Sequence, residues 1–328
     1  MGKSKVNGVS KNPSVDLLKG ALILLVMAGH AMELTHQHHL ALWVGSGFRM
    51  PLMIGISGYL LNVAQTRTDP PGKIFRRYGE RMLLPWVVAM LVYVLISGWR
   101  LEWALPIELL LRPPFHLWYI AILFFLIMLT RLVPLSPLLL LAIGAPVSLA
   151  TMYGFGLDHG PIGDSLLSPD NRYLRYPVYF FFGMLMAERG LRARHAGVAM
   201  LVCLLGLLWW AELYSADNIL ALVSARLLMC LGLIALLPIL SRWRIACAPL
   251  NAIGRDSLFF YLWHPLVMGV LVLGGWGPLA TVALALLALA LASRLTGRHR
   301  GIARLVGSIA PGRPVAPVQP QMAVTAAA

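Results

Sequence analysis

Charged residues are scarce in this sequence. Asp, Glu, Lys and Arg make up only 12% of its 328 residues, whereas 59% are hydrophobic, and the mean hydropathy is +0.76. These values lie outside the range of ordinary soluble domains. The scarcity of charge therefore excludes a soluble globular protein and predicts an all-α, polytopic membrane helix bundle.

Cysteine and acidic residues are also few. The three cysteines lie far apart without a CxxC or Cys/His spacing, which is typical of small core residues and not of a disulfide framework or zinc site. Lys and Arg outnumber Asp and Glu by 27 to 13, giving a net charge of +14. The basic residues lie in short loops between apolar runs, and no aromatic-basic motif of a nucleic-acid-binding surface accompanies them, so we expect no nucleic-acid partner.

Long apolar runs recur along the chain. The first extends from Val15 to Leu34 and the second from Leu40 to Leu61. Further runs are centred near Met90, Ile122, Ile143, Phe181, Leu205, Leu228, Met268 and Leu286. At roughly 20 residues per span, the pattern predicts about ten transmembrane helices. The first run is long and contains ionisable residues, so we expect it to remain as a helix and not to be removed as a signal peptide.

Loop charges predict the orientation of these spans, because Lys and Arg accumulate on the cytoplasmic side of a membrane. With ten spans, the most basic segments all fall on one side: residues 1–14, 67–81, 189–194, 242–255 and the tail after 296. Both termini are then cytoplasmic. We expect residues 1–14 to form a basic arm, 15–296 one transmembrane domain, and 297–328 a disordered Pro-, Ala- and Gly-rich tail.

The first apolar run carries ionisable residues deep in the predicted membrane. A helix starting near Val15 places His30 roughly 20 Å along its axis, beyond the bilayer midplane. Ionisable groups at such depth are costly and normally face a bundle interior, so they are functional candidates. Glu33 lies one turn further on and could orient the imidazole ring, which makes His30 a candidate general base. The other interpretation is a hydrogen bond to a neighbouring helix.

Other polar residues fall at a similar level in the predicted bundle. Arg49 lies inside the second run, His116 and Trp118 open the fourth span, and Arg226 lies inside the eighth. Cationic groups in a dry site could stabilise a developing oxyanion or hold a polar substrate. Arg49 could instead neutralise Glu33 as a structural pair, and Trp118 could be a packing aromatic.

The turn after the first run is rich in histidine. Its three residues, His36, His38 and His39, superficially resemble a metal-binding cluster. Because no carboxylate or cysteine partner stands at a fixed spacing, the turn is interpreted as an exposed loop, and we expect no metal site.

Four sequence blocks carry a resemblance to a known family. These are VDLLKGALILLVMAGH, FRMPLMIGISGYLL, HLWYIAILFF and GRDSLFFYLWHPLV, and their order and spacing resemble those of acyltransferase family 3 membrane proteins over about Val15 to Leu295. The chain is most similar to the fucose 4-O-acetylase-like branch. The resemblance implies a ten-helix enzyme of the bacterial inner membrane. Such an enzyme transfers an acyl group, usually acetyl from cytoplasmic acetyl-CoA, to a sugar hydroxyl at the outer face.

The resemblance also implies roles for individual residues. The family's first helix has a basic residue, ten intervening positions and a histidine, which Lys19 and His30 match, although the family more often has arginine first. The family's basic loop corresponds to three residues that could hold the phosphates of CoA, or serve only as a positive-inside anchor: Arg76, Arg77 and Arg81. His264 matches a late-helix histidine, which we expect lower in the membrane, lining the donor channel.

The expected reaction is direct acyl transfer, in which His30, held by Glu33, takes a proton from a sugar hydroxyl as it attacks the thioester. Arg49 is the expected oxyanion or substrate clamp, and the pantetheine arm is expected to enter from the cytoplasm between the helices. The sequence leaves open an acyl-histidine intermediate, the acceptor glycan, and acetyl against succinyl as the donor group. The expected partners are acyl-CoA, a carbohydrate acceptor, membrane lipid and other envelope-glycan assembly proteins.

Two alternatives belong to other classes. In a transporter or flippase for a glycan or small solute, the buried charges would form a proton relay or substrate counter-ion. The sequence shows no repeated halves and no matched pair of broken helices, which disfavours this hypothesis. The third hypothesis is a structural subunit of a complex that assembles envelope glycans.

Overall fold

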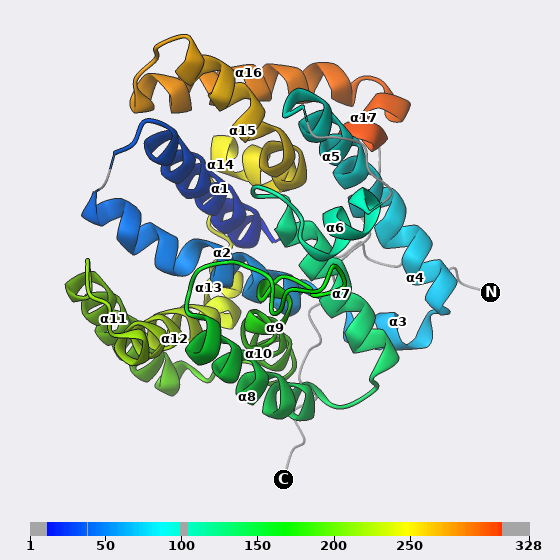
Figure 1. The fold of residues 1–328 in the computed structure, drawn as a ribbon. Helices are drawn as coiled ribbons and strands as arrows, with labels where there is room; N and C mark the ends of the chain where they lie inside the picture. Colours follow the sequence, from blue (N-terminus) through cyan, green and yellow to red (C-terminus); the bar gives the residue numbers. More distant parts are fainter. Residues whose placement is uncertain (1–11, 38, 99–103, 310–328) are drawn as a thin grey trace.

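The computed structural model describes residues 12–37, 39–98 and 104–309. Within these ranges the chain is helical, apart from turns, loops and one isolated antiparallel bridge between Pro161 and Asp170 (Figure 1). The prediction of an all-α fold is confirmed. Most of the expected basic arm and residues 310–328 of the expected tail lie outside the described residues.

Seven stretches of the described chain are long and apolar enough to cross a membrane. Five are single helices: α1 (Pro13–Leu34), α2 (Leu40–Leu60), α8 (Pro137–Phe155), α11 (Ala193–Glu212) and α16 (Pro278–Gly297). The sixth, Pro71–Ile96, consists of α4 (Pro71–Tyr78), the π-helix η1 (Gly79–Leu83) and α5 (Leu84–Ile96). The seventh, Ile219–Trp243, consists of α12 (Ile219–Ala235) and α13 (Leu237–Trp243). A bend of 88° separates α14 (Ala248–Arg255) from α15 (Ser257–Leu273), and this pair makes an eighth if it is one span.

The remaining two apolar runs form shorter helices. The helix α7 (Trp118–Leu132) has 15 residues and α10 (Pro177–Arg189) has 13, so their axes are about 20 Å long against about 30 Å of hydrocarbon. Every predicted run therefore contains a helix, while the count of ten spans and the cytoplasmic orientation of the termini stay predictions. Short helices complete the described chain: α3 (Val63–Thr68), α6 (Leu105–Leu111), α9 (Arg172–Arg175) and α17 (Arg300–Val306).

The outer surface of the bundle is apolar. On α11, Val198, Leu201, Leu205 and Leu208 are 54–66% exposed and recur every three or four residues, so they form one outward stripe. Exposed leucines also line α16, where Leu279 is 87% exposed. Contiguous apolar surface of this extent suits contact with lipid. The helix composition and this surface together indicate an integral membrane protein.

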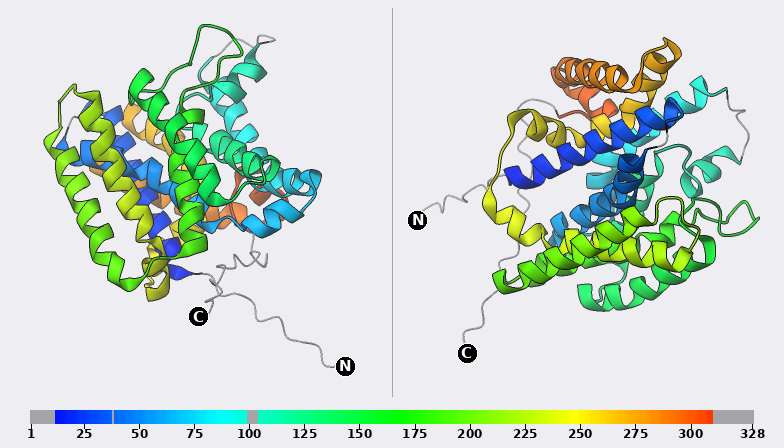
Figure 2. Two further views of the ribbon diagram at one scale, coloured as in Figure 1. Left: turned by 90° about the horizontal axis from the view of Figure 1, so that it is seen from below. Right: turned by 90° about the vertical axis from the view of Figure 1, so that its left-hand side faces the viewer.

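The helix α2 occupies the middle of the bundle (Figures 1 and 2). It lies between α1 on one side and α10, α11 and α12 on the other. Glycines allow α2 and α10 to pack closely: a Cβ at Gly58 would lie 2.0 Å from the Phe180 carbonyl oxygen, and a Cβ at Gly183 would lie 2.1 Å from that of Gly55. Small residues at such crossings let membrane helices approach backbone to backbone. This packing fixes α2, which carries Arg49.

The turn between α1 and α2 is short because local signals end one helix and start the next. His36 adopts a positive φ of 54°, which stops α1, and His39 accepts a hydrogen bond from the Ala41 N–H at its ring Nδ1 (3.2 Å), which caps α2. Within the described residues, no group of three His, Cys, Asp or Glu side chains could hold a metal ion. His38 lies outside those residues.

The expectation of a disordered tail from residue 297 is wrong for its first part. Residues Arg300–Val306 form α17, with Ala303 buried. The Trp263 indole donates to the Val306 carbonyl (2.9 Å), and the Ile309 N–H donates to the Asp256 carboxylate (2.8 Å). These contacts with distant parts of the chain order the segment. The prediction of disorder used composition alone, which carries no information about such contacts.

Candidate functional site

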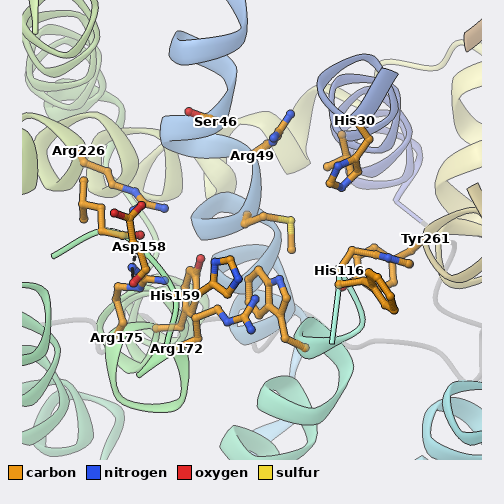
Figure 3. A pocket seen from close by; sticks show the side chains of 16 residues that line it. His30, Ser46, Arg49, His116, Asp158, His159, Arg172, Arg175, Arg226 and Tyr261 are labelled. Atoms are coloured by element: carbon orange, nitrogen blue, oxygen red, sulfur yellow. Dashed lines mark hydrogen bonds between the residues drawn. The ribbon is translucent and has the colours of Figure 1, made fainter. Parts of the chain in front are cut away.

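A cavity of about 270 Å³ lies where α1, α2, α7, α12 and α15 meet the loop that carries α9. Figure 3 shows its polar side chains. Those that line it are His30, Ser46, Arg49, His116, Trp118, Asp158, His159, Arg172, Arg175, Tyr176, Arg226 and Tyr261. The cavity therefore combines three histidines and four arginines with a single carboxylate.

A histidine–carboxylate pair lies on α1 at this cavity. Nδ1 of His30 is 2.7 Å from Oε2 of Glu33, three residues further along the helix. When Nδ1–H donates to the carboxylate, Nε2 keeps its lone pair and can accept a proton. About a quarter of the His30 side chain (27%) and half of the Glu33 side chain (53%) are exposed. The pair has the geometry of an oriented general base.

Arg49 joins this pair from α2. Its Nη2 donates to the other Glu33 oxygen (3.0 Å), and its Nη1 donates to the Leu25 carbonyl (3.3 Å). Gly29 provides the space, since a Cβ there would lie 1.5 Å from Nη1 of Arg49. Glu33 thus contacts both His30 and Arg49, one with each carboxylate oxygen. The sequence suggested each of these two contacts separately.

Two more histidines surround His30. The ring of His264 stacks on that of His30 with centroids 5.4 Å apart, and the ring of His116 lies 6.2 Å from His30 and 5.2 Å from His264. His264 is fully buried, and its Nδ1 donates to the Phe260 carbonyl (2.8 Å). In the part of the chain that the structure describes, Nε2 of His116 and of His264 has no hydrogen-bond partner.

His264 was expected lower in the membrane than His30, and the structure places its ring against that of His30, with centroids 5.4 Å apart. The reason lies in α14, which packs along the first turns of α1, where a Cβ at Gly254 would touch the Asp16 carbonyl oxygen at 1.7 Å. After the 88° bend, α15 also packs against α1. This packing brings the ring of His264 to that of His30.

The structure also brings Trp118 and Arg226 to the cavity. Trp118, the first residue of α7, stacks on Tyr176 with ring centroids 4.9 Å apart. Nε of Arg226 donates to the Gly47 carbonyl of α2 (3.0 Å). With His30, His116 and Arg49, these residues line one cavity, so the structure brings together the polar residues that the sequence placed at a similar level.

Apart from His264, the residues expected to bind the acyl donor lie elsewhere. Lys19 pairs with Asp16 (3.2 Å) and lies 11 residues before His30, about 16 Å away along α1. Arg76 and Arg81 are exposed on the α4–η1 segment, and Arg77 pairs with Asp69. None of these residues lines the cavity. The expected passage from the basic loop to His30 is therefore not part of this cavity.

Sequence reasoning missed the contribution of the loop before α10. Arg172 makes a bidentate ion pair with Asp170 (2.8 Å for both bonds), and its guanidinium carbon lies 4.9 Å from the centre of the Trp118 ring. Arg175, one turn further on, is 3% exposed. Two arginines spaced by three residues directly before an apolar run, as in NRYLRYP, were the available signal.

The same loop adds His159 to the cavity wall. Burial lowers the pKa of His159 below its usual value, and the positive charges of Arg172 and Arg175 lower it further. Asp158 and Asp170 oppose this effect more weakly. His159 is therefore neutral at pH 7 and adds no charge to the arginines around it.

A bundle of apolar helices around a cavity that holds an oriented histidine–carboxylate pair defines a membrane protein equipped for proton transfer. The chain matches the family model described as an acyltransferase domain over residues 12–296, so it belongs to acyltransferase family 3. It is a membrane acyltransferase. The chain matches none of the curated proteins and none of the solved structures with which it was compared. The likeness to the fucose 4-O-acetylase-like branch stays a prediction.

Proposed function

We propose that this acyltransferase moves an acetyl group from acyl-CoA to a sugar hydroxyl of an extracytoplasmic or lipid-linked glycan, in the bacterial inner membrane. The observation that carries the proposal is the 2.7 Å contact between His30 and Glu33 beside a polar cavity. An alcohol is a weak nucleophile at neutral pH, so acyl transfer to it needs a base at the acceptor oxygen. His30 meets that need.

In the proposed reaction, Nε2 of His30 takes the proton of the sugar hydroxyl as the oxygen attacks the thioester carbonyl. The tetrahedral intermediate then breaks its C–S bond, and the imidazolium returns the proton to the CoA thiolate. Glu33 holds Nδ1–H and stabilises the imidazolium between these steps. General-base assistance of this kind supplies about 10² to 10⁴-fold in rate.

The contacts of Arg49 refine its proposed role. Two of its nitrogens already bond to Glu33 and to the Leu25 carbonyl. Arg49 therefore holds Glu33 in place and supplies positive charge near the oxyanion. We expect it to stabilise the oxyanion by this charge and not by binding the oxyanion with both of these nitrogens. His116 and Trp118 would contact the acceptor, because both line the cavity.

The donor side of the proposal rests on the basic loop. Arg76, Arg77 and Arg81, with Lys19, would hold the phosphates of CoA through charge-assisted hydrogen bonds. The helix α7 begins at the cavity with Trp118 and ends near this loop, where Nε of Arg131 donates to the Asp69 carbonyl (3.0 Å). The pantetheine arm would have to cross about 20 Å between these ends. The helices must separate to admit it.

The test uses membranes that contain the full chain and labelled acetyl-CoA. We expect release of CoA together with an alkali-labile label on a glycan, and neither in membranes without the protein. Movement of unmodified glycan across the membrane without ester formation would contradict the proposal and favour a transporter.

A further inference from the structure

The arginines of the cavity differ in how their charges are balanced. Arg49 pairs with Glu33 and Arg172 pairs with Asp170. Arg175 and Arg226 take part in none of the ion pairs among the described residues, although they are only 3% and 7% exposed. Two buried guanidinium groups thus remain without a carboxylate partner.

Backbone groups hold these two arginines without neutralising them. Arg226 donates from Nε to the Gly47 carbonyl and also bonds to the Tyr176 side chain. Arg175 donates from Nη1 to the carbonyls of Leu157 and Asp158, and its buried Nε has no partner within the described chain. Carbonyls fix the direction of a guanidinium but leave its full charge, and a buried uncompensated charge is costly.

The remaining charges around them do not remove the excess. The carboxylate of Asp158 lines the cavity but forms no ion pair with either arginine at the 4 Å limit. His159 is neutral at pH 7 because its pKa is lowered. One acidic side chain therefore faces two unpaired arginines, and a ligand anion would complete the balance.

The positions of these groups indicate how such a ligand would lie. Figure 3 shows Arg226, Arg175 and Asp158 at one end of the cavity and His30, His116 and Tyr261 at the other, with Arg49 between them. An acceptor that fills the cavity thus presents one part to the base and another part to the arginines.

We propose that Arg175 and Arg226 bind an anionic group, a carboxylate or a phosphate, that the acceptor sugar carries, so that its hydroxyl faces His30. This inference rests on the proposed function, because it takes the cavity as the acceptor site. The phosphates of CoA offer the same chemistry from a second source. The acceptor is favoured because the basic loop, about 20 Å away along α7, is the expected place for those phosphates.

Binding of defined probes tests the proposal independently of catalysis. The purified chain in detergent micelles is melted with methyl β-glucuronide, glucose 6-phosphate, methyl β-glucoside or CoA. We expect the two anionic sugars to raise the melting temperature and methyl β-glucoside to leave it unchanged. Arg226→Gln and Arg175→Gln should each weaken binding of the anionic sugars at least ten-fold. Arg194→Gln, an exposed site on α11, should bind as the wild type does.

A conservative variant controls for loss of binding through misfolding. Arg226→Lys keeps the charge but loses the planar fork, so it should retain part of the binding that Arg226→Gln loses. Equal stabilisation by methyl β-glucoside and methyl β-glucuronide, or no stabilisation by either anionic sugar, would overturn the inference. Loss of CoA protection in Arg226→Gln with unchanged sugar binding would also overturn it, and would assign the anion to the donor.

An acyl-transfer assay distinguishes a failure of this inference from a failure of the proposed function. With labelled acetyl-CoA, Arg226→Gln should raise KM for an anionic acceptor at least ten-fold and change kcat little. Anion binding without any acyl transfer would contradict the proposed function and leave the anion site standing. Transfer to neutral glycans alone would support the proposed function and refute the anion site.

Discussion

Two basic clusters lie at opposite ends of α7 and differ in how their charges are held. In the loop cluster, defined by residues 67–81, Lys73 (2.7 Å) and Arg77 both pair with Asp69, while Arg76 and Arg81 are exposed. In the cavity, all four arginines are buried, and backbone carbonyls hold two of them without a carboxylate. The same residue type thus serves in two electrostatic settings.

The difference shows that the burial of an arginine decides what its charge can do. Exposed ion pairs are screened by water and salt and contribute only about 0–1 kcal/mol each. Arginines inside a membrane bundle are costly and must be oriented by neighbours, so the cavity arginines are candidates for a functional role. The loop cluster suits reversible attraction of a soluble donor, whereas the cavity suits oriented binding and chemistry.

Removing the base from the cavity should have the largest effect on activity. His30→Ala should lower acyl transfer by about 10² to 10⁴-fold, because the acceptor hydroxyl then loses its proton acceptor. Its expression and melting temperature should stay close to those of the wild type. His195→Ala, an exposed histidine on α11, is the matched control and should keep full activity. Near-normal transfer by a well-expressed His30→Ala protein would refute the assignment.

Removing the charge behind His30 should have the next largest effect. Glu33→Gln keeps the shape of the side chain but no longer stabilises the imidazolium, so we expect kcat to fall by about 10²-fold, at the lower end of the range for base assistance. The matched variant is Glu188→Gln, an exposed glutamate of α10, which should change nothing. Equal kcat in the two variants would show that Glu33 does not support the base.

A change of packing behind Arg49 should have an intermediate effect. In Gly29→Ala, the new methyl group would lie 1.5 Å from Nη1 of Arg49, so the guanidinium must leave Glu33. We expect about 1–3 kcal/mol of lost stability and reduced transfer. Gly45→Ala places a methyl group in open space on α2 and is the control. Wild-type melting and activity in Gly29→Ala would show that Arg49 is not held as described.

The loop cluster should respond more weakly than the cavity. Arg76→Gln should raise KM for acetyl-CoA a few-fold at low salt and leave kcat unchanged, because an exposed charge contributes to binding but not to chemistry. The difference from the wild type should shrink in high salt. An unchanged KM at low salt would leave Arg76 as a positive-inside anchor only.

The smallest effect concerns Asp69. Its hydrogen bonds to Lys73 and Arg77 hold its pKa below the usual 3.8. A lowered pKa in the fold means that the stabilisation is present at neutral pH and is lost as pH falls below 3.8 toward the lowered value. The melting temperature of the wild type should therefore drop over this acid range, and Asp69→Asn should lack that part of the drop. Identical acid profiles would contradict this linkage.

Local spacing explains which parts of the site the sequence could predict. His30 and Glu33 stand three residues apart in one helix, so the helix geometry alone brings their side chains together. Arg49 and Arg226 could be singled out as functional candidates because a charge within an apolar run is costly whichever way its side chain points. The partners of Arg49 could not be chosen from the sequence, since they depend on the room that Gly29 leaves.

Long-range packing explains what the sequence could not predict. The contact of His264 with His30 depends on how α14 and α15 pack against α1. Arg172 and Arg175 reach the cavity through a loop whose path no periodic pattern describes. The order of residues 300–309 likewise depends on contacts with Asp256 and Trp263.

The apolar runs and the pairing of His30 with Glu33 follow from the sequence alone, because both depend on spacing within a single helix. Which helices face one another depends on the packing of the folded bundle. This packing gathers three histidines and four arginines around one cavity, and two of those arginines form no ion pair with a carboxylate among the described residues. Such contacts depend on the packing of the whole bundle, and no local pattern encodes them.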